Sequence, residues 1–368
     1  MNQEQSKVTS YFFLANTYRR LNLLKKAIKC YDSCIKIDKN CIGAYIKAGY
    51  LYYLLEDTNR AASYLNKAIS IDNKNYIAHH YLGLVFKDTN FFDQARLHFK
   101  QAFALNPSSG LSAYHLGELS RIQNKTSDAI KWYQKASEIP SSYQSDARYM
   151  IQSLQKTSSV LRAPKEYIEK LFDGYSQSFE ANLCKNLEYK VPEQFRDILL
   201  RPPFKKIYAR GLDLGCGTGL CGEEVIKLCE RLEGVDLSLK MLKKAKQKHI
   251  YNELHHEDII TYLKDTHQKY DLVVCGDTLI YFGDLSKVFK LIRACLKDSG
   301  NFLFSIEAQS DGSFELQKTA RFSHSSKYIR KLAEKFRFNI KLEKNAIIRT
   351  ESKDPINGKI FLLQAFTS

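Results

Sequence analysis

Three closely spaced glycines follow an apolar segment in the second half of the chain. The motif DLGCGTG places Gly215, Gly217 and Gly219 directly after a run that ends at Leu214. Because glycine has no side chain, backbone amides in such a turn can approach a ligand at the N-terminus of the next helix. The turn therefore suits a nucleotide-like cofactor. On its own it is ambiguous, since Gly217, Gly219 and Gly222 also satisfy GxGxxG, the dinucleotide fingerprint.

Three carboxylates help to decide between the possible cofactors. Asp213 lies within the predicted first strand, two residues before the glycines, where it can organise the pocket and face a cationic amino acid group. Asp236 ends a second apolar strand in the motif GVDLS and can accept hydrogen bonds from both ribose hydroxyls, although it could also cap the following helix. Asp258 ends a third strand in HHEDI, where it can accept from an adenine amino group, with Ile259 beside the ring. A dinucleotide site would need only Asp236, so the set favours an adenosine cofactor that carries an amino acid.

Parallel strands must bring these groups to one edge of a sheet. The segment YDLVV, residues 270–274, predicts a fourth strand that opens into Cys275, Gly276 and Asp277. Open α/β sheets bind ligands at this carboxyl end. GNFLFSIE, residues 300–307, predicts a fifth strand, and KIFLLQAF, residues 359–366, predicts the last one. The second half is therefore expected to be an α/β, Rossmann-like domain.

The first half of the chain repeats itself with a period of 34 residues. Ala27, Ala61, Ala95 and Ala129 begin similar phrases, such as AIKCYDSCIKI and AIKWYQKASEI. Three further sets of equivalent positions, which we call columns, recur with the same spacing of 34 residues. They are Ala15, Gly49, Gly83 and Gly117; Tyr31, Leu65, Phe99 and Tyr133; and Cys34, Ala68, Ala102 and Ala136. A small residue lets two helices approach and a large one fills the groove, so each unit predicts a helical hairpin. The pattern resembles four tetratricopeptide repeats over residues 8–143, followed by a capping helix over residues 145–156.

Two roles are open for this all-α solenoid. It could be a rigid spacer that packs against its own catalytic domain, or a groove for a protein or peptide partner. The resemblance assigns to its concave face Phe12, Asn16, Arg19, Tyr50, Tyr53, Lys87, Tyr114 and Arg121. Aromatic side chains interleaved with cations suit a peptide with acidic groups. The Lys/Asn pattern by which some chaperone-binding repeats hold a terminal carboxylate is not reproduced, because Phe12, Ile77 and Tyr81 occupy the corresponding positions.

The order of DLGCGTG, GVDLS, an acidic third-strand end and YDLVV resembles the class I S-adenosylmethionine-dependent methyltransferases, over about residues 164–368. The segments FDGYSQSFEANL and RFSHSSKYI, together with the fused repeats, are similar to a bacterial group of predicted methyltransferases that contain tetratricopeptide repeats. The resemblance implies a multidomain chain. Its parts would be a repeat array with capping helix over residues 8–157, a linker and lid segment over 158–180, and a methyltransferase domain with a seven-stranded sheet over 181–368.

S-adenosyl-L-methionine is the cofactor that this resemblance implies. The matching positions are Asp213, Gly215, Gly217 and Gly219 for its methionine part, Asp236 for its ribose, Leu237, Asp258 and Ile259 for its adenine, and Cys275 through its backbone. The sulfonium already makes the methyl group electrophilic, so the protein chiefly has to align a nucleophile and exclude water. No metal is required for this chemistry.

Side chains that could act on the substrate are less clearly marked. Candidates are Tyr175 and Phe179 in the lid segment, together with Asp277, Tyr281 and His324, and a structural role is the alternative for each. Cys216 and Cys221 are expected to pack rather than react, since nothing nearby in the sequence would activate a thiolate.

Composition and net charge limit the classes of protein to which the chain can belong. A chain with 44% hydrophobic residues, 17 Gly and 7 Pro is expected to fold. The net charge of +16 comes without long runs of like charge or a known nucleic-acid motif, so it favours a basic surface over a nucleic-acid site. The sequence shows neither a leader peptide nor an apolar stretch of about 18 residues. Nine Cys without CxxC pairs or metal-type spacing favour reduced thiols, and hence a soluble cytoplasmic protein.

Three functions remain open. A methyltransferase that acts on a protein or carrier-bound substrate recruited by the repeats is favoured. The alternatives are a small-molecule methyltransferase that uses the array as a scaffold, and a non-catalytic adaptor that binds the cofactor.

Overall fold

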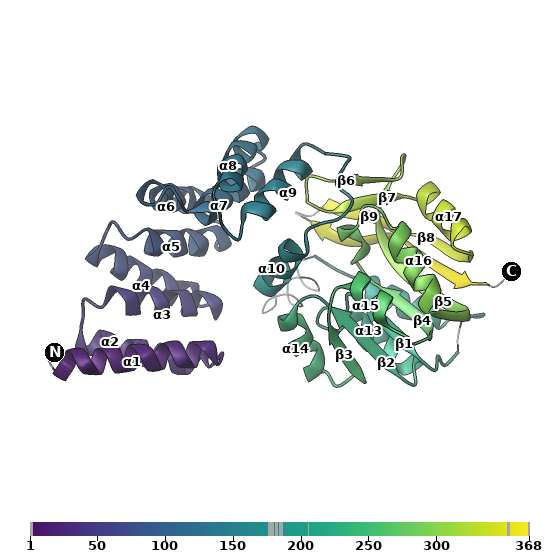
Figure 1. The fold of residues 1–368 in the computed structure, drawn as a ribbon, viewed down its shortest axis with the longest axis horizontal. Helices are drawn as coiled ribbons and strands as arrows, with labels where there is room; N and C mark the ends of the chain where they lie inside the picture. The colour runs from purple at the N-terminus through teal and green to yellow at the C-terminus, as the bar shows by residue number, and fades with distance from the viewer. Residues whose placement is uncertain are drawn as a thin grey trace. The chain divides into compact units, whose positions relative to one another are not determined.

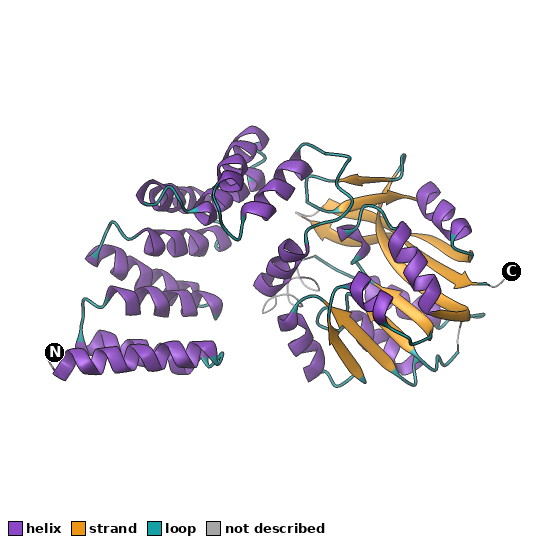
Figure 2. Cartoon of the chain, in the orientation of Figure 1, coloured by secondary structure: helices purple, strands orange, loops and turns teal. Residues whose placement is uncertain are grey.

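The structure is a computed structural model that describes residues 3–175, 180, 183, 187–204, 206–351 and 354–366. The chain divides into two compact units, Met1–Ile151 and Gln152–Ser368. The first is helical, and all the strands belong to the second (Figures 1 and 2). The division lies within one helix, α9 (Gln144–Leu154), a little before the end of the expected array at residue 157.

Four helical hairpins build the first unit, as the 34-residue period predicts. They are α1 (Gln3–Arg20) with α2 (Leu24–Ile37), α3 (Ile42–Leu54) with α4 (Thr58–Ile71), α5 (Tyr76–Asp88) with α6 (Phe92–Leu105), and α7 (Gly110–Ile122) with α8 (Thr126–Glu138). The helix α9 follows where a capping helix is expected. Within each hairpin the turn contains one residue with positive φ, at Asn22, Glu56, Asn90 and Asn124. These turn residues keep the same period.

The columns of small residues mark where the helices of a hairpin touch. A Cβ added at Gly49 would lie 2.8 Å from Leu65, and one added at Gly83 or Gly117 would lie 2.7 Å from the ring of Phe99 or Tyr133. The alanines of the repeated phrase are fully buried. Close packing leaves no room for larger side chains at these positions, so the columns are a consequence of the helix crossings.

A single nine-stranded sheet forms the centre of the second unit. Its strands run in the order β3 (Glu253–His256), β2 (Leu232–Asp236), β1 (Gly211–Leu214), β4 (Tyr270–Cys275), β5 (Leu296–Gln309), β9 (Asp354–Ala365) and β8 (Phe338–Glu351). Strands β1 to β5 are parallel, and β9 is antiparallel to both of its neighbours. The predicted α/β class is confirmed.

The sheet has two strands more than the seven expected. The strand β7 (Phe322–Ser325) pairs in parallel with the last residues of β5, and β6 (Phe314–Leu316) pairs antiparallel with β7. Both follow the carboxyl end of β5, where they add to the edge that carries the candidate site residues.

Helices cover both faces of this sheet. They are α12 (Val191–Leu199), α13 (Leu220–Val225), α14 (Leu239–Gln247), α15 (Ile259–Asp265), α16 (Ser286–Cys295) and α17 (Ser326–Lys335), with short 3₁₀ turns η2 (Ile226–Leu228) and η3 (Leu279–Tyr281). The helix α10 (Lys165–Tyr175) packs against α14. Successive residues of β5 point to opposite faces. On one face, Leu303 packs with Phe195 of α12. On the other face, the ring centroids of Phe302 and Phe304 each lie 5.7 Å from that of Phe289 in α16. The sheet is thereby buried on both sides.

None of the helices in the described ranges combines the length and the apolar character that crossing a lipid bilayer requires. The eight cysteines that these ranges include are all free thiols.

Candidate functional site

The glycine turn after β1 has a backbone that other residues rarely adopt. Gly215, Gly217 and Gly219 have φ values of 70°, 54° and 94°, in the left-handed region. At Gly215 an added Cβ would also lie 2.3 Å from Oγ1 of Thr278. The turn therefore needs glycine, and it presents backbone rather than side chains at the carboxyl edge of the sheet.

Asp236, at the end of β2, holds this turn in place. Its carboxylate accepts hydrogen bonds from the backbone N–H groups of Gly217 and Ser238, both at 2.8 Å. The side chain of Ser238, not that of Asp236, caps α14 by accepting from the N–H of Met241 at 3.2 Å. Burial raises the pKa of the Asp236 carboxyl. The carboxylate is thus fixed between the ends of β1 and β2.

Asp213 lies beneath the turn and is almost fully buried, with 1% of its surface exposed. Its carboxylate accepts a hydrogen bond of 2.7 Å from the phenol of Tyr251. Burial raises the pKa of Asp213 to about 7; the charge of Asp236 acts in the same direction, and the bond from Tyr251 opposes it. A buried carboxyl with this pKa can hold a proton or face a cation.

Tyr251 also explains the last glycine of the GxGxxG pattern. A Cβ added at Gly222 would lie 2.2 Å from the phenol oxygen of Tyr251. The need for glycine here comes from packing inside the protein. Tyr251 was not singled out from the sequence, since it precedes β3 and reaches Asp213 only through the fold.

Asp258 caps α15 and takes part in an ion pair. Its carboxylate accepts from the N–H of Ile260 at 3.2 Å and lies 3.4 Å from the ammonium of Lys165. Arg162 donates to both of its oxygens, and the guanidinium lies 4.4 Å from the centroid of the Phe282 ring. Burial alone would raise the pKa of Asp258, but Arg162 and Lys165 hold it below its ordinary value. The carboxylate expected to receive an adenine amino group is already occupied.

The chain around Arg162 lies along the loop that follows β4. Ala163 donates its N–H to the carbonyl of Tyr281 at 2.9 Å, and Gly283 donates to the carbonyl of Leu161 at 2.8 Å. Farther along, Ser238 donates its hydroxyl to Asp173 of α10 at 2.6 Å. Residues 161–173, which we call the strap, therefore connect the carboxyl ends of β2, β3 and β4 (Figure 1).

The other residues predicted to bind the cofactor, Ile259, Leu237 and Cys275, also lie at the carboxyl edge of the sheet. Ile259 is buried as the first residue of α15, and the carbonyl of Leu237 accepts from Nε2 of His256 at 2.9 Å. Cys275 ends β4 and is fully buried, which raises the pKa of its thiol. Burial likewise raises the thiol pKa of Cys216 and Cys221, as expected for packing residues.

An ionic cluster joins the ends of β4, β5 and β8. Arg349, in β8 and 1% exposed, donates to both oxygens of Asp277 at 2.9 Å each and also to Glu307. Its Nε donates to Glu351 at 2.8 Å, and Arg321 pairs with the same glutamate. Arg349 is not among the candidates predicted from the sequence; its position directly after the apolar residues Ala346, Ile347 and Ile348 is the signal that could have revealed a buried charge.

The substrate-side candidates differ in their surroundings. Asp277 is held by Arg349, as described. His324 is fully buried, its Nε2 lies 2.9 Å from the carbonyl of Phe282, and burial lowers its pKa to about 4. Tyr281 is 5% exposed and its ring lies 5.6 Å from Phe172 of the strap, while burial raises its pKa.

Two candidates from the lid segment cannot be located. Tyr175 ends α10, but its side chain lies outside the described structure, and so does the whole of Phe179.

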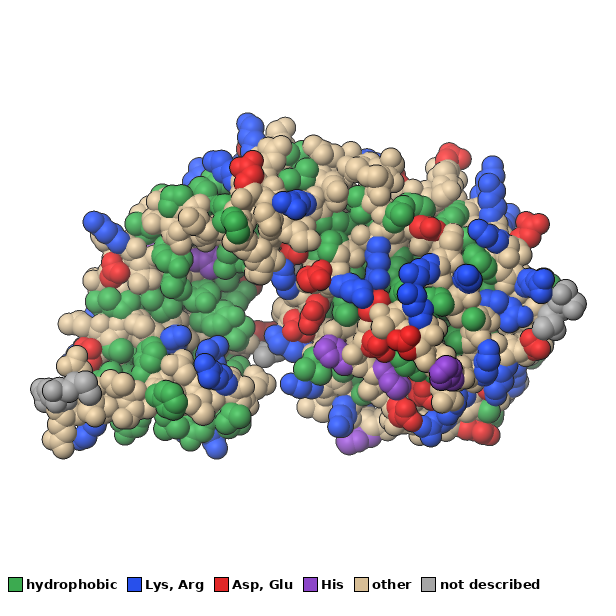
Figure 3. Space-filling view, viewed as in Figure 1, with side chains coloured by type: hydrophobic (Ala, Val, Ile, Leu, Met, Phe, Trp, Pro, Cys, Tyr) green, Lys and Arg blue, Asp and Glu red, His purple; other side chains and the backbone are tan. Residues whose placement is uncertain are grey.

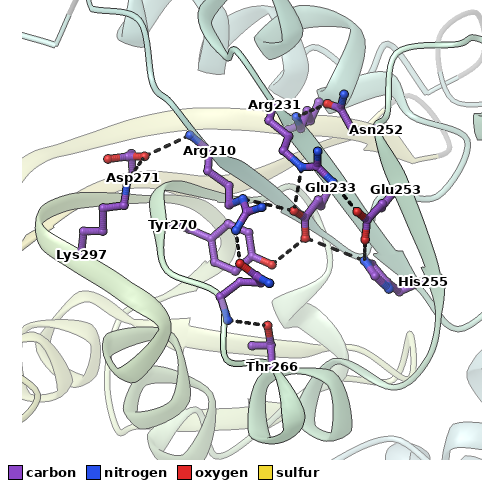
Figure 4. A network of polar contacts seen from close by, with 12 residues as sticks. Arg210, Arg231, Glu233, Asn252, Glu253, His255, Thr266, Tyr270, Asp271 and Lys297 are labelled. Carbon is purple, nitrogen blue, oxygen red and sulfur yellow. Dashed lines mark hydrogen bonds and ion pairs between the residues drawn. The ribbon is translucent and has the colours of Figure 1, made fainter.

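A second polar network lies at the opposite edge, where β2 and β3 begin (Figure 4). Glu233 accepts from the phenol of Tyr270 at 2.8 Å and lies near Glu253 and His255. Arg210 and Arg231 approach Glu233 to 3.3 and 3.5 Å. Because these guanidinium groups supply the positive charge that a metal ion would bring, we interpret the network as structural.

Family models match both halves of the chain. Residues 212–302 match the methyltransferase domain, and residues 8–41 and 42–75 each match a tetratricopeptide repeat. The first match covers β1 to β4 and the glycine turn, and the second covers the first two hairpins.

Curated relatives divide in the same way. The ubiquinone biosynthesis O-methyltransferase of Coxiella burnetii is 32% identical over 98 residues, which are 26% of this chain and 42% of that protein. The malonyl-[acyl-carrier protein] O-methyltransferase of Bacillus cereus is 26% identical over 144 residues, 38% of this chain and 52% of that protein. Anaphase-promoting complex subunit 3 of Schizosaccharomyces pombe is 27% identical over 127 residues, 34% of this chain and 19% of that protein. The chain thus spans about half or less of the length of these relatives.

Solved structures include similar folds. An S-adenosylmethionine-dependent methyltransferase from Clostridium acetobutylicum aligns with a TM-score of 0.40 and 18% identity, over 54% of this chain and 99% of that one. The N-methyltransferase NodS from Bradyrhizobium japonicum, in complex with S-adenosyl-L-homocysteine, aligns with a TM-score of 0.39 and 18% identity, over 47% of this chain and 86% of that one.

Proposed function

Since the chain joins tetratricopeptide repeats to a methyltransferase domain, we propose that it transfers a methyl group from S-adenosyl-L-methionine to a protein or carrier-bound acceptor that the repeats recruit. The observation that carries this proposal is the overlap of the domain match with the glycine turn and its carboxylates. Asp213, Asp236 and Asp258 all lie within residues 212–302 and all belong to the carboxyl edge of the sheet.

The residues of this edge fit the proposed cofactor. Gly215, Gly217 and Gly219 expose backbone to its methionine part, and the buried Asp213 has the raised pKa of a carboxyl that gains from a nearby cationic amino group. Asp236 is assigned to the ribose, Leu237, Asp258 and Ile259 to the adenine, and Cys275 to the cofactor through its backbone. When bound, the cofactor supplies an electrophilic methyl group on sulfur. The protein binds and orients it and keeps water away.

The methyl acceptor is proposed to enter near the ends of β4 and β5. Of the candidates there, Asp277 is held by Arg349 and His324 is enclosed and uncharged, so neither is offered to an acceptor as a base. Tyr281 is the candidate that contacts the strap. We therefore expect alignment of the acceptor, more than removal of its proton, to be the main contribution of the protein.

Recruitment by the repeats is the second part of the proposal. One relative bears the name of an enzyme for a carrier-bound acceptor, malonyl-[acyl-carrier protein], and tetratricopeptide repeats in general support interactions between proteins. A small-molecule methyltransferase with the array as scaffold is the alternative, because another relative belongs to ubiquinone biosynthesis. A cofactor-binding adaptor without catalysis is the third possibility.

One experiment separates these three functions. The full chain is incubated with S-adenosylmethionine that carries a radiolabelled methyl group and with fractionated lysate. Label in the macromolecular pool is the expected result, and label confined to the small-molecule pool would favour the scaffold alternative. Absence of label from every fraction, with cofactor binding intact, would favour the adaptor. The Gly217→Val variant is the matched control, since its side chain would fill the glycine turn.

A further inference from the structure

The first two hairpins carry the cations Arg19 and Lys47, for which no ion pair is found among the described residues. Lys47 of α3 is half-buried, and its ammonium lies 5.8 Å from the centroid of the Phe12 ring. Burial, and then the positive charge of Arg19 at the end of α1, lower the pKa of Lys47. Within the described part of the chain, no carboxylate forms an ion pair with Arg19 or Lys47. A half-buried ammonium that is influenced by a second positive charge gains stability when a ligand supplies negative charge.

Lys87 and Arg121, which are expected together with Arg19 on the concave face, are already paired with carboxylates. The ammonium of Lys87 lies 3.0 Å from its neighbour Asp88, and Arg121 lies 3.2 Å from Glu118 one turn earlier on α7. These pairs reduce the attraction that Lys87 and Arg121 can offer to an acidic partner. Of these four cations, Arg19 and Lys47 are the two that form no ion pair with a carboxylate within the described part of the chain.

A pair of tyrosines adjoins these cations. The rings of Tyr50 in α3 and Tyr81 in α5 are stacked, with centroids 4.4 Å apart and planes inclined by 20°. Burial raises the pKa of both phenols, and the charge of Arg19 opposes that effect at each, so its guanidinium acts on both rings. Figure 3 shows hydrophobic and tyrosine side chains gathered at the surface of the repeat array, with Lys and Arg among them. Apolar and cationic surface therefore lie together.

We propose that Arg19 and Lys47 form a carboxylate-binding site whose occupant is an acidic segment of the methyl-acceptor protein. Carboxylates of an extended peptide pair with the two cations, and a neighbouring apolar side chain packs against Tyr50 and Tyr81. The inference rests on the proposed function, in which the repeats recruit the acceptor. It adds the place on the array and the chemistry that is recognised.

A nucleic acid matches this site less well. Polynucleotide binding draws on many phosphate contacts along a backbone, whereas this site offers two uncompensated cations. The rings of Tyr50 and Tyr81 stack on each other, so one face of each ring is already covered and not available to a base. A peptide carboxylate needs no more than the two cations.

The site is tested by fluorescence anisotropy with the full chain. The probe is a labelled glutamate-rich peptide that contains one leucine, and the reference is the same peptide with glutamine in place of glutamate. We expect the glutamate peptide to bind and the glutamine peptide to bind at least about 10-fold more weakly, with affinity falling as salt rises. The double variant Arg19→Gln/Lys47→Gln should lose about 10-fold or more in affinity for the glutamate peptide.

Matched variants check that the loss is local. Arg20→Gln removes an exposed cation beside Arg19, and Lys87→Gln removes a cation already paired with Asp88; each should change peptide affinity by less than about 3-fold. Lys47→Met keeps the apolar stem near Phe12 and removes the uncompensated charge, so it should raise the melting temperature while weakening peptide binding. A fall in melting temperature would mean that the ammonium stabilises the fold, and would overturn the assignment.

Three other outcomes would also overturn it: equal binding of the two peptides, unchanged affinity of the double variant, or tighter binding of a single-stranded DNA probe that the double variant loses. Methyl transfer to lysate protein is scored separately with the same proteins. If the double variant loses the peptide but labels protein as well as the wild type, the carboxylate site stands and recruitment fails. If the wild type labels protein but never binds the peptide, the site fails and methyl transfer stands.

Discussion

At the scale of single residues, the three carboxylates of the sheet edge have different partners. Asp236 is bound by backbone N–H groups of two segments, Asp213 by a phenol in a buried pocket, and Asp258 by a guanidinium. The carboxylate of Asp236 is therefore a hydrogen-bond acceptor in a fixed position, and the carboxyl of Asp213 can take up or release a proton near neutral pH. The carboxylate of Asp258 already accepts hydrogen bonds from Arg162. Each of the three leads to its own prediction.

Replacing Asp236 by alanine should weaken cofactor binding by roughly 1.5 to 3 kcal/mol, as expected when hydrogen bonds to a charged group are lost. Calorimetry with S-adenosylmethionine measures this change, and circular dichroism checks that the variant is folded. NAD is the control ligand and should not bind. Unchanged affinity in the variant would mean that Asp236 only supports the backbone of the glycine turn.

Cofactor binding should release protons near neutral pH. The pKa of Asp213 is about 7 without a cation nearby, so the carboxyl is about half protonated at pH 7. A cationic amino group beside it favours the ionised form, so binding should release up to about half a proton at that pH. Calorimetry in buffers of different ionisation enthalpy measures the released protons. The Asp213→Asn variant should show no such release, and release equal to that of the wild type would contradict the assignment.

The same pKa predicts how the stability of the empty protein depends on pH. The folded state binds the proton of Asp213 more tightly than the unfolded state, whose aspartates titrate near pH 3.9. The contribution of this group is therefore largest below that pH and is lost as the pH rises through about 7. This group should lower the melting temperature of the wild type as the pH rises from 5 to 8, and differential scanning calorimetry should show a smaller decrease for the Asp213→Asn variant.

Removing Arg162 should tighten cofactor binding. Its guanidinium occupies the carboxylate that an adenine amino group would use, so Arg162→Gln leaves Asp258 with unmet hydrogen-bonding capacity until the cofactor binds. The empty variant should melt at a lower temperature, and the dissociation constant should fall several-fold. Lys165→Gln, which removes a more exposed partner of Asp258, is the control. Weaker binding by Arg162→Gln would show that the ion pair positions Asp258 for the cofactor.

The sequence predicts glycines and strand-end carboxylates better than it predicts their partners. Gly215 and Asp236 belong to local motifs, since a turn and the strand before it are neighbours in the chain. Tyr251 and Arg162 reach Asp213 and Asp258 from 38 and 96 residues away. Contacts at such separations depend on the packing of the whole domain and leave no periodic pattern.

At the scale of elements, the repeat hairpins contain a group of buried and half-buried histidines. The ring of His80 lies 5.3 Å from Phe99 and 5.4 Å from His115, and Nδ1 of His79 lies 3.0 Å from Nδ1 of His98. Burial lowers the pKa of His80 and His98 to about 4 and that of His115 well below its ordinary value. These helices must therefore pack around uncharged rings.

Mild acid should loosen α5, α6 and α7. Histidines in the unfolded chain take up protons near pH 6.5, but the buried rings resist protonation until about pH 4, so stability is lost as the pH falls through this window. Hydrogen exchange at pH 7.5 and 5, corrected for intrinsic rates, measures the loss of protection. His98→Phe should reduce the loss, because a phenyl ring can stack on Phe86 without titrating. Equal protection in both conditions would contradict this prediction.

Elements with a strong period were predicted more completely than those without one. The four hairpins follow from columns of small and large residues, and β1 to β5 follow from apolar runs that end in polar motifs. The pair β6 and β7 was missed, because strands of three and four residues in the segment SFELQKTARFSHS give no clear alternation. Their pairing depends on the long strand β5, whose end reaches beyond the segment predicted for it.

At the scale of the whole molecule, contacts of Ser153 and Arg162 determine where a shortened chain can begin without losing stability. Ser153 donates to the carbonyl of Gln317 at 2.7 Å and accepts from the N–H of Ala320 at 3.2 Å, and Arg162 pairs with Asp258. A shortened chain that starts at residue 144 keeps these contacts, so we expect it to fold and to bind the cofactor as the full chain does. A start at residue 164 removes them and should lower the melting temperature. Equal melting temperatures would show that residues 144–163 add little to the stability of the second unit.

The position of β9 has a consequence for synthesis on the ribosome. The strand β9 lies between β5 and β8, although it is the last of the described strands in the sequence. Each hairpin of the repeats joins neighbours in the chain and can fold as it emerges, whereas the edge of β5 stays open until residues beyond 354 have been translated. The nascent protein thus passes through a stage in which finished repeats precede an incomplete sheet, and in that interval the bare edge of β5 is open to chaperones or to aggregation.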